Sequence, residues 1–230
     1  RSPVSSLFSA GLLLLVVLGA GDSLSHLPLA ALAALIVVAV STLFDIKGLV
    51  RAWQFDRMDG ASWLITFLGV LSLGLEAGII MGIALSAAGL LWRMSRPHIA
   101  VLGRIPCSEH FRNVQRHHVE TLPHTIFLRI DGNLFFGNWA RIREVIGARI
   151  EQHSGQIEHL VLNLASVNDI DTTALEGILG LQEDLQEDGV SLCLAEIRGP
   201  VGDKLKGHLH GIPVYLSSHE AYEALMERPA

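Results

Sequence analysis

Two adjacent hydroxyl groups set among carboxylates are the side chains of this sequence best suited to chemistry. They belong to Thr172 and Thr173, in the run 168–175, which reads N-D-I-D-T-T-A-L. A β-rich apolar stretch precedes the run and a helical stripe of apolar residues follows it, so the run lies where a strand gives way to a helix. A phosphate on Thr172 would meet the positive end of that helix and would crowd Asp169 and Asp171. The pattern predicts a regulatory, phosphorylatable site at these four residues.

A purely structural interpretation fits the same residues. Thr173 and Glu176 have the spacing of a capping box, which predicts Thr173 as the N-cap of the helix. The two hydroxyls and Asp171 would then only satisfy the unpaired amides of the first turn. The sequence leaves both interpretations open.

The cysteines and histidines of the sequence give little indication of catalysis or metal binding. The only cysteines, Cys107 and Cys193, are expected to be free thiols, and zinc would need more ligands at close spacing. Ten of the 11 histidines follow residue 97 and are interpreted as solvated or locally packed. We therefore expect no metal, no cofactor and no enzymatic activity.

The charge is divided unevenly along the chain. Residues 1–97 hold six basic and five acidic residues, whereas residues 98–230 hold 11 basic and 18 acidic ones. Half of the 230 residues are hydrophobic, and the mean hydropathy is +0.42. An acidic second half argues against nucleic-acid binding, which needs a basic surface. The apolar first half predicts a lipid bilayer as its surroundings.

Four uncharged stretches in the first half predict four membrane spans, at about 7–20, 27–44, 61–75 and 77–92. The alternative is that 61–92 forms one broken hairpin dipping into the membrane. Basic residues occur between the second and third stretches and after the fourth, which places both regions in the cytoplasm. We expect a multi-pass protein of the inner (plasma) membrane with a cytoplasmic second half.

Small residues at four-residue spacing mark the last predicted span. Gly78, Gly82 and Ser86 would share one helix face and let a neighbouring helix approach closely. Either a sliding contact or ordinary helix packing explains this stripe. Glu76 is expected at the turn between the last two spans, where it would be solvated; the alternative is an intramembrane carboxylate with a role in ion coupling.

The second half alternates strand and helix patterns and predicts a small α/β layer fold. The expected strands lie near 98–103, 125–130, 133–136, 157–164, 190–197 and 213–216. The expected helices lie near 139–150, 175–185 and 200–208, with a last one from Ser217, where Ser217 and Glu220 form a capping box.

Several motifs in order resemble one family. The run 168–175 resembles the central motif of STAS domains, which occur in anti-sigma-factor antagonists and in the tails of SulP (sulfate permease-like) anion transporters. Residues 134–138, L-F-F-G-N, resemble a segment of the transporter tails. Residues 96–106 resemble their membrane-to-STAS junction, 111–114 their F-R-D/N-V motif, 75–83 their E-x-G-x-x-x-G span and 45–57 their cytoplasmic loop. The antagonists read D-S-S/T-G where this chain has Asp171, Thr172, Thr173 and Ala174.

The resemblance implies a fold and a domain plan. SulP proteins are similar to the uracil transporter, with two inverted repeats of seven spans. Residues 1–95 then resemble the last four spans, 96–120 a linker with the first strand, and 121–230 a cytoplasmic STAS domain. The chain looks like the C-terminal piece of a longer protein, and no substrate site is complete within it, because the family's anion site lies upstream. Gly78, Gly82 and Ser86 would pack a gate helix.

Two functions follow as hypotheses. The first is secondary active transport of sulfate, bicarbonate or a dicarboxylate, with the STAS domain as a regulatory tail. The second is a membrane-tethered STAS signalling module of the anti-sigma-factor-antagonist type. The partners to consider are the bilayer, a small anion, a second copy of the chain in a homodimer, and a cytoplasmic regulatory protein at the STAS domain.

Overall fold

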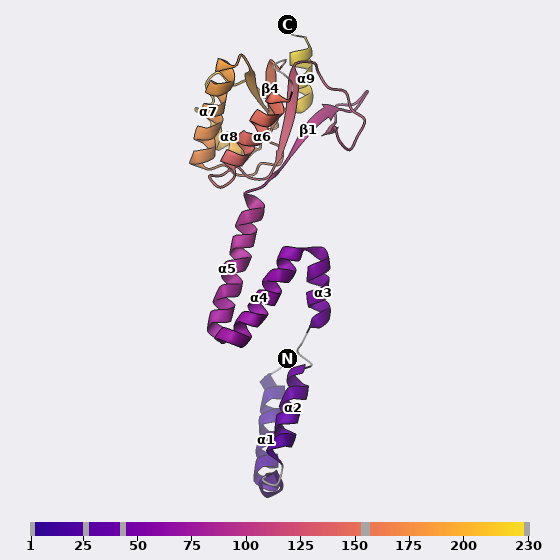
Figure 1. Ribbon diagram of the computed structural model, residues 1–230, viewed down its shortest axis with the longest axis vertical. Helices are drawn as coiled ribbons and strands as arrows, with labels where there is room; N and C mark the ends of the chain where they lie inside the picture. The colour runs from indigo at the N-terminus through magenta and orange to yellow at the C-terminus, as the bar shows by residue number, and fades with distance from the viewer. Residues whose placement is uncertain (1–2, 25–27, 42–44, 153–156, 228–230) are drawn as a thin grey trace. The chain divides into compact units, whose positions relative to one another are not determined.

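The computed structural model describes residues 3–24, 28–41, 45–152 and 157–227 (Figure 1). The chain forms two compact units, Arg1–Gly82 and Ile83–Ala230, with the boundary inside a helix. The helices before residue 97 are α1 (Pro3–Leu24), α2 (Leu29–Ser41), α3 (Ile46–Phe55), α4 (Arg57–Leu73) and α5 (Leu75–Met94).

Two stretches are long and apolar enough to cross a membrane by length and composition, within the described residues. They are Leu75–Met94, which is α5, and Leu29–Phe55, over which α2 and α3 lie. A shorter apolar stretch, Val4–Gly19, lies in α1. The four-span count therefore stays a prediction, as do the domain boundaries attached to it.

The region 45–60, interpreted from its charges as a loop, contains a helix. Asp45 caps α3 by accepting a hydrogen bond from the Gly48 amide at 2.8 Å, and Asp56 caps α4 through the Met58 amide at 2.8 Å. Carboxylates at these positions satisfy orphan amides of a first turn. The mixture of apolar and basic residues in 46–55 is the pattern of an amphipathic helix.

A tight turn joins α4 to α5. Gly74 ends α4 with a φ of +90°, a conformation that glycine adopts without steric cost. Glu76 lies in the first turn of α5 and is exposed. The expected turn between the last two spans is thus centred on Gly74.

The second unit contains a six-stranded mixed sheet in the order β2-β1-β3-β4-β5-β6. The first three strands are antiparallel, and β3 to β6 run parallel. The strands are β1 (His98–Arg104), β2 (Phe111–Asn113), β3 (Thr125–Asp131), β4 (His159–Asn163), β5 (Ser191–Ala195) and β6 (Val214–Tyr215). The helices are α6 (Trp139–Glu151), α7 (Thr172–Glu187), α8 (Gly199–Leu205) and α9 (Ser218–Met226).

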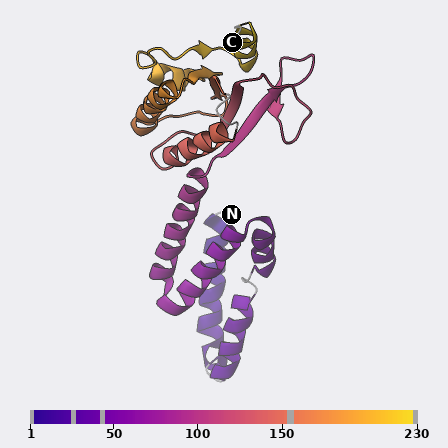
Figure 2. The ribbon, with the colours of Figure 1, turned by 45° about the horizontal axis from the view of Figure 1, so that its top comes forward.

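Apolar side chains cover both faces of this sheet. Alternate strand residues such as Leu128, Leu162 and Leu194 pack with α6, α7 and α8. The intervening residues, such as Phe127 and Val161, pack with α9. Figures 1 and 2 show these helices on opposite sides of the sheet. A sheet buried on both faces explains why its parallel strands read as continuous apolar runs.

Two expectations about local structure have clear outcomes. The N-cap at Ser217 is confirmed, because its hydroxyl accepts a hydrogen bond from the Glu220 amide at 3.0 Å. The Glu220 side chain accepts from the Leu216 amide at 2.7 Å rather than from the Ser217 amide of a full capping box. The strand expected at 133–136 is wrong. Only an isolated bridge forms there, between Leu134 and Ile170. The residues around it make a turn whose polar groups contact the run 168–175.

Candidate regulatory site at the start of α7

Asp171 organises the first turn of α7. Its Oδ1 atom accepts a hydrogen bond from the Ala174 amide at 2.8 Å, which makes Asp171 the N-cap residue. The prediction that Thr173 is the N-cap is wrong, since the helix begins at Thr172. Both threonines lie in the first turn with exposed side chains. A hydroxyl at Thr172 is thus accessible and next to the positive end of a 16-residue helix.

The segments 168–171 and 133–138 belong to two of the motifs noted in the sequence, and they are hydrogen-bonded to each other. The second carboxylate oxygen of Asp171 accepts a hydrogen bond from the Phe136 amide at 2.8 Å. Leu134 exchanges backbone hydrogen bonds with this segment, donating to Asp169 and accepting from Asp171 at 3.1 and 3.2 Å. Asn133 accepts from the Asn168 amide at 3.1 Å. We call residues 133–138 the hinge turn.

The hinge turn also presents an aromatic side chain to solvent. Phe136 is 73% exposed, while its neighbour Phe135 is partly buried and meets it edge to face. The backbone amide of Phe136 is held by Asp171, so the residue that carries this exposed ring is tied to the N-cap of α7.

A basic residue from α8 balances part of the acidic charge. Lys204 donates to the Asp169 carboxylate at 2.6 Å and to the Ile170 carbonyl at 2.9 Å. The hydrogen bond from Lys204, together with one from the Ile170 amide, lowers the pKa of the Asp169 carboxyl. Asp169 therefore stays ionised, and a phosphate on Thr172 would add charge near an ionised group.

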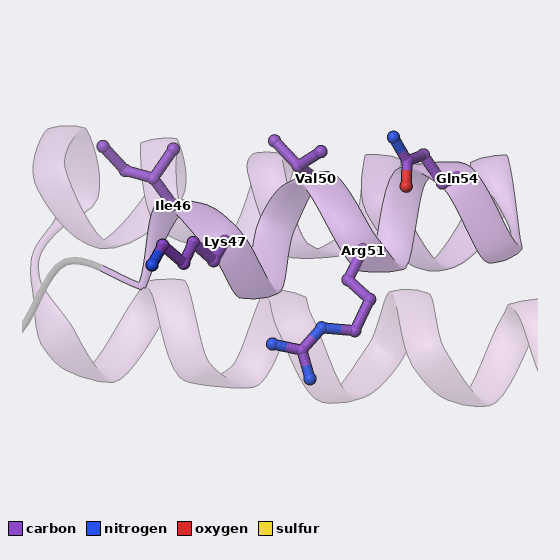
Figure 3. A pocket seen from close by; sticks show the side chains of 5 residues that line it. All are labelled: Ile46, Lys47, Val50, Arg51 and Gln54. Atoms are coloured by element: carbon purple, nitrogen blue, oxygen red, sulfur yellow. The ribbon is translucent and has the colours of Figure 1, made fainter.

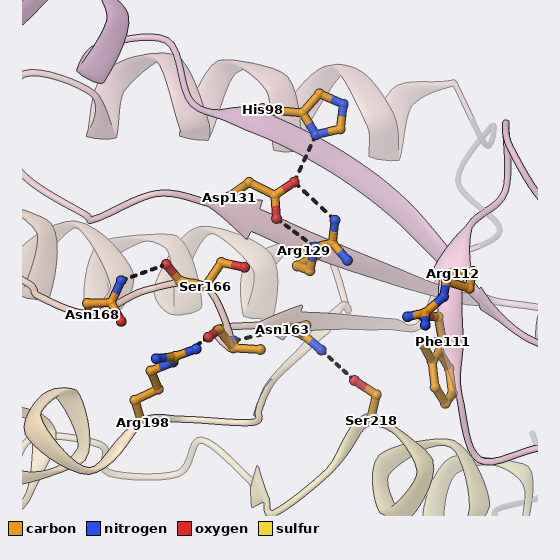
Figure 4. A network of polar contacts seen from close by, with 11 residues as sticks. His98, Phe111, Arg112, Arg129, Asp131, Asn163, Ser166, Asn168, Arg198 and Ser218 are labelled. Carbon is orange, nitrogen blue, oxygen red and sulfur yellow. Dashed lines mark hydrogen bonds and ion pairs between the residues drawn. The ribbon is translucent and has the colours of Figure 1, made fainter. Parts of the chain in front are cut away.

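A separate polar network lies at the carboxyl ends of β3, β4 and β5 (Figure 4). Asp131 accepts two hydrogen bonds from Arg129, at 2.6 and 3.1 Å, and contacts His98 at 2.9 Å. Burial alone would raise the pKa of Asp131, but the hydrogen bonds from Arg129 and His98 outweigh burial and lower it. The same contact with Asp131 raises the pKa of Arg129. This network fixes the start of β1 to the end of β3.

Beside it, the end of β4 carries a buried amide side chain. Asn163 is 3% exposed and donates to the Ser218 hydroxyl at 2.7 Å. Its carbonyl oxygen accepts from the Ala165 amide at 3.0 Å. Ser218 in turn donates to Glu196 at 2.7 Å. Asn163, Ser218 and Glu196 thus form a series of hydrogen bonds. We interpret this series as structural support for the loop that leads to residue 168.

Glycines bring α4 and α5 close together within the first unit. Gly78 and Gly82 are buried, and a Cβ atom at Gly78 would lie 2.5 Å from the backbone of Val70. A Cβ atom at Gly82 would lie 2.7 Å from the side chain of Thr66. Ser86, the third residue of the predicted stripe, is exposed. Their role in packing a gate helix stays a prediction.

A shallow groove runs along the exposed side of α3 (Figure 3). Ile46 and Val50 line one side of it, and Lys47 and Arg51 lie beside them, as Figure 3 shows. The groove thus combines an apolar stripe with two cations. Among the described residues no group of three or more His, Cys, Asp or Glu side chains has a metal-binding arrangement, and neither Cys107 nor Cys193 forms a disulfide.

Comparison with known proteins identifies the two parts of the chain. The sequence model of the sulfate permease family matches residues 1–66, and that of the STAS domain matches residues 116–221. The chain belongs to the sulfate permease family. The matched residues 116–221 accordingly belong to a STAS-like α/β domain, in which the site at Thr172 lies at the start of α7.

Other members of the sulfate permease family resemble most of this chain. High affinity sulfate transporter 2 of Stylosanthes hamata is 33% identical over 87% of the chain and 32% of its own length. A probable sulfate transporter of Mycobacterium tuberculosis is 31% identical over 90% of the chain and 37% of its own length. The chain thus spans about a third of the length of these curated relatives. Their names place it in a transporter family rather than an enzyme family.

A solved structure shares the fold of this sulfate permease chain. The murine solute carrier 26 family member A9 anion transporter, in its inward-facing state, matches 99% of this chain and 38% of its own, with a TM-score of 0.78 and 21% identity. The match extends over both the helices and the STAS domain. The family match at residues 1–66 and the sulfate transporter relatives support the sulfate permease hypothesis over that of a tethered signalling module.

Sequence reasoning found the hydroxyls and carboxylates of the site but missed two of its members. Phe136 and Lys204 belong to it through hydrogen bonds to Asp171 and Asp169, each made across 35 residues. The resemblance of 134–138 to a family segment was the only signal for Phe136.

Proposed function

We propose that this chain is part of a secondary transporter for a small anion of the sulfate, bicarbonate or dicarboxylate class. In this proposal residues 1–95 supply the last four spans of a fold with two inverted repeats of seven spans, and the substrate site lies mainly outside this chain. The observation that carries the proposal is the occurrence of a sulfate permease match and a STAS match in one chain, with the fold of an anion transporter across both.

The proposal places the STAS domain in the cytoplasm. Lys47 and Arg51 lie in α3 and Arg57 begins α4, while Arg93 lies in the last turn of α5 and Arg96 follows that helix. Basic residues in such positions favour the cytoplasmic side of an inner or plasma membrane. On that side the two cations of the α3 groove would face the negatively charged leaflet.

The STAS domain would regulate transport through the site at Thr172. The two exposed hydroxyls, the carboxylates of Asp169 and Asp171, and the exposed ring of Phe136 support this role. Phosphate on Thr172 would repel the neighbouring carboxylates and alter the first turn of α7. A cytoplasmic regulatory protein at this surface and a homodimer of the transporter belong to the same proposal.

Reconstitution tests the transport activity. The full-length protein in proteoliposomes should take up radiolabelled sulfate, and bicarbonate or dicarboxylates added outside should compete if they share the site. Protein-free liposomes serve as the control. A well-folded preparation that moves no small inorganic or organic anion would exclude the proposed function.

A further inference from the structure

The last turn of α5 is bound by a side chain 44 residues away. A helix leaves its final carbonyl groups without partners inside the helix. The carbonyl of Met94, the last residue of α5, accepts a hydrogen bond from Asn138 Nδ2 at 3.1 Å. Both residues belong to the same compact unit. The STAS domain therefore caps the helix that leads into it.

Asn138 uses its side chain for this contact rather than for its own helix. It occupies the N-cap position of α6, where an asparagine ordinarily accepts from amides of the first turn. Its side chain makes no capping bond to α6, a helix described in full. Instead Nδ2 donates to Met94 and also to the Asn133 carbonyl at 2.8 Å, while Oδ1 accepts from the Phe135 amide at 3.0 Å.

Burial makes these bonds costly to lose. Asn138 is 1% exposed, so neither amide proton can turn to water when a partner moves. The side chain is held at both ends by the hinge turn, and its remaining donor points at α5. A displacement of the hinge turn must therefore displace Asn138 or break its bond to Met94.

The hinge turn is bound on its other side to the candidate regulatory site. Phe136 donates to Asp171, Asn133 accepts from the Asn168 amide, and Leu134 exchanges backbone hydrogen bonds with Asp169 and Asp171. A continuous series of hydrogen bonds thus runs from the N-cap of α7, through the hinge turn and Asn138, to the end of α5. Closely packed interiors have low compressibility and transmit strain, and these bonds give strain a direct route.

We propose that Asn138 is the positioning residue that couples the start of α7 to the end of α5. A change at the start of α7, such as charge on Thr172, shifts the Phe136 amide bound by Asp171, and Asn138 transmits that shift to the Met94 carbonyl. In the reverse direction, a movement of α5 alters the first turn of α7. This inference deepens the proposed regulation of transport and rests on it for its physiological meaning.

A nearly isosteric substitution removes the two donated bonds. In Asn138→Asp the side chain still accepts from the Phe135 amide, but it donates to neither Met94 nor Asn133 and sets a carboxylate against their carbonyl oxygens. Asn163→Asp is the matched control, because Asn163 is also buried in the same domain, the substitution also introduces a buried carboxylate, and its hydrogen bonds go to Ala165 and Ser218 rather than to Met94. A merely structural role for Asn138 predicts similar effects of the two substitutions.

Hydrogen exchange of the full-length protein in lipid nanodiscs tests the coupling. The readout is exchange at the Ser95 and Arg96 amides, which bond to the Leu91 and Arg93 carbonyls, with β5 as an internal reference for global unfolding. Asn138→Asp should speed this exchange about tenfold relative to β5, and Asn163→Asp should not. Equal effects of the two substitutions would overturn the proposal.

A double-mutant cycle tests transmission. Asp171→Ala breaks the bond to Phe136. In the wild-type and Asn163→Asp backgrounds it should speed exchange at Ser95 and Arg96. In the Asn138→Asp background it should cause no further change. Additive effects of Asp171→Ala and Asn138→Asp would overturn the coupling. Sulfate uptake, measured separately, decides the proposed function. If sulfate uptake is absent but the cycle is non-additive, the transport proposal fails and the coupling through Asn138 stands. If uptake is normal but the effects are additive, the coupling fails and the transport proposal stands.

Discussion

The backbone amide of Phe136 donates a hydrogen bond to Asp171 Oδ2 at 2.8 Å, across 35 residues of sequence. The other carboxylate oxygen of Asp171 caps α7 through the Ala174 amide. One side chain thus fixes both the start of a helix and the turn that carries an exposed aromatic ring. The conformation around Thr172 depends on this carboxylate more than on either threonine.

Replacement of Asp171 by alanine is expected to destabilise the STAS domain. Loss of an N-cap costs about 0.5–2 kcal/mol, and here the Phe136 amide loses its partner as well. Thr173→Ala, at an exposed position outside the cap, should change stability by less than about 0.5 kcal/mol. Urea unfolding of the two variants measures both values. A larger loss for Thr173→Ala would contradict the assignment of the cap.

Glycine-to-alanine substitutions in two helices should change the free energy of unfolding in opposite directions. Gly78→Ala places a Cβ atom against the backbone of Val70 and should destabilise the α4–α5 pair by about 1–3 kcal/mol. Gly147→Ala lies in α6, where nothing stands within 4 Å, and should stabilise its helix by about 0.5–1 kcal/mol. Thermal unfolding in detergent compares them. Stabilisation by Gly78→Ala would show that the two helices do not approach as described.

Acid should weaken the junction between β1 and β3 through Asp131. Its pKa is lowered in the folded state from an ordinary value of 3.8, so it stabilises the fold above that value and loses this effect as pH falls through the folded pKa. The difference in unfolding free energy between wild type and Asp131→Asn should therefore be largest near neutral pH and should shrink below about pH 4. Asp203→Asn, on the exposed side of α8, serves as a control. A difference for Asp131→Asn that stays constant into acid would refute the lowered pKa.

The alternation of strands and helices after residue 97 was predictable because hydrophobic periodicity reports burial directly. Strands such as β4 and β5 are buried on both faces, and their apolar runs identify them. Element ends were harder. Asp171 and Thr173 are both residue types that favour an N-cap. The cap at Asp171 is accompanied by a hydrogen bond from the Phe136 amide, and no local sequence pattern contains that contact.

Two other features of the structure differ from the sequence-based expectation for the same reason, which is that they depend on contacts between distant residues. The segment 133–136 has strand-like residues, but its polar groups bond to Asp171 and Asn168 rather than to a full ladder. The contact between Asn138 and Met94 left no sequence signal, because tertiary hydrogen bonds between distant residues follow from the fold. The site could therefore be located from its hydroxyls and carboxylates, but its connections could not.

Uptake of radiolabelled sulfate by proteoliposomes of the wild type, Thr172→Ser and Thr172→Asp tests most directly whether this is a transporter regulated through its STAS domain. Wild type and Thr172→Ser retain the hydroxyl and should transport at the same rate. Thr172→Asp adds permanent charge beside Asp171 and should change the rate several-fold at equal protein incorporation. Equal uptake by all three would contradict regulation at Thr172, and no uptake by any of them would contradict the transport function itself.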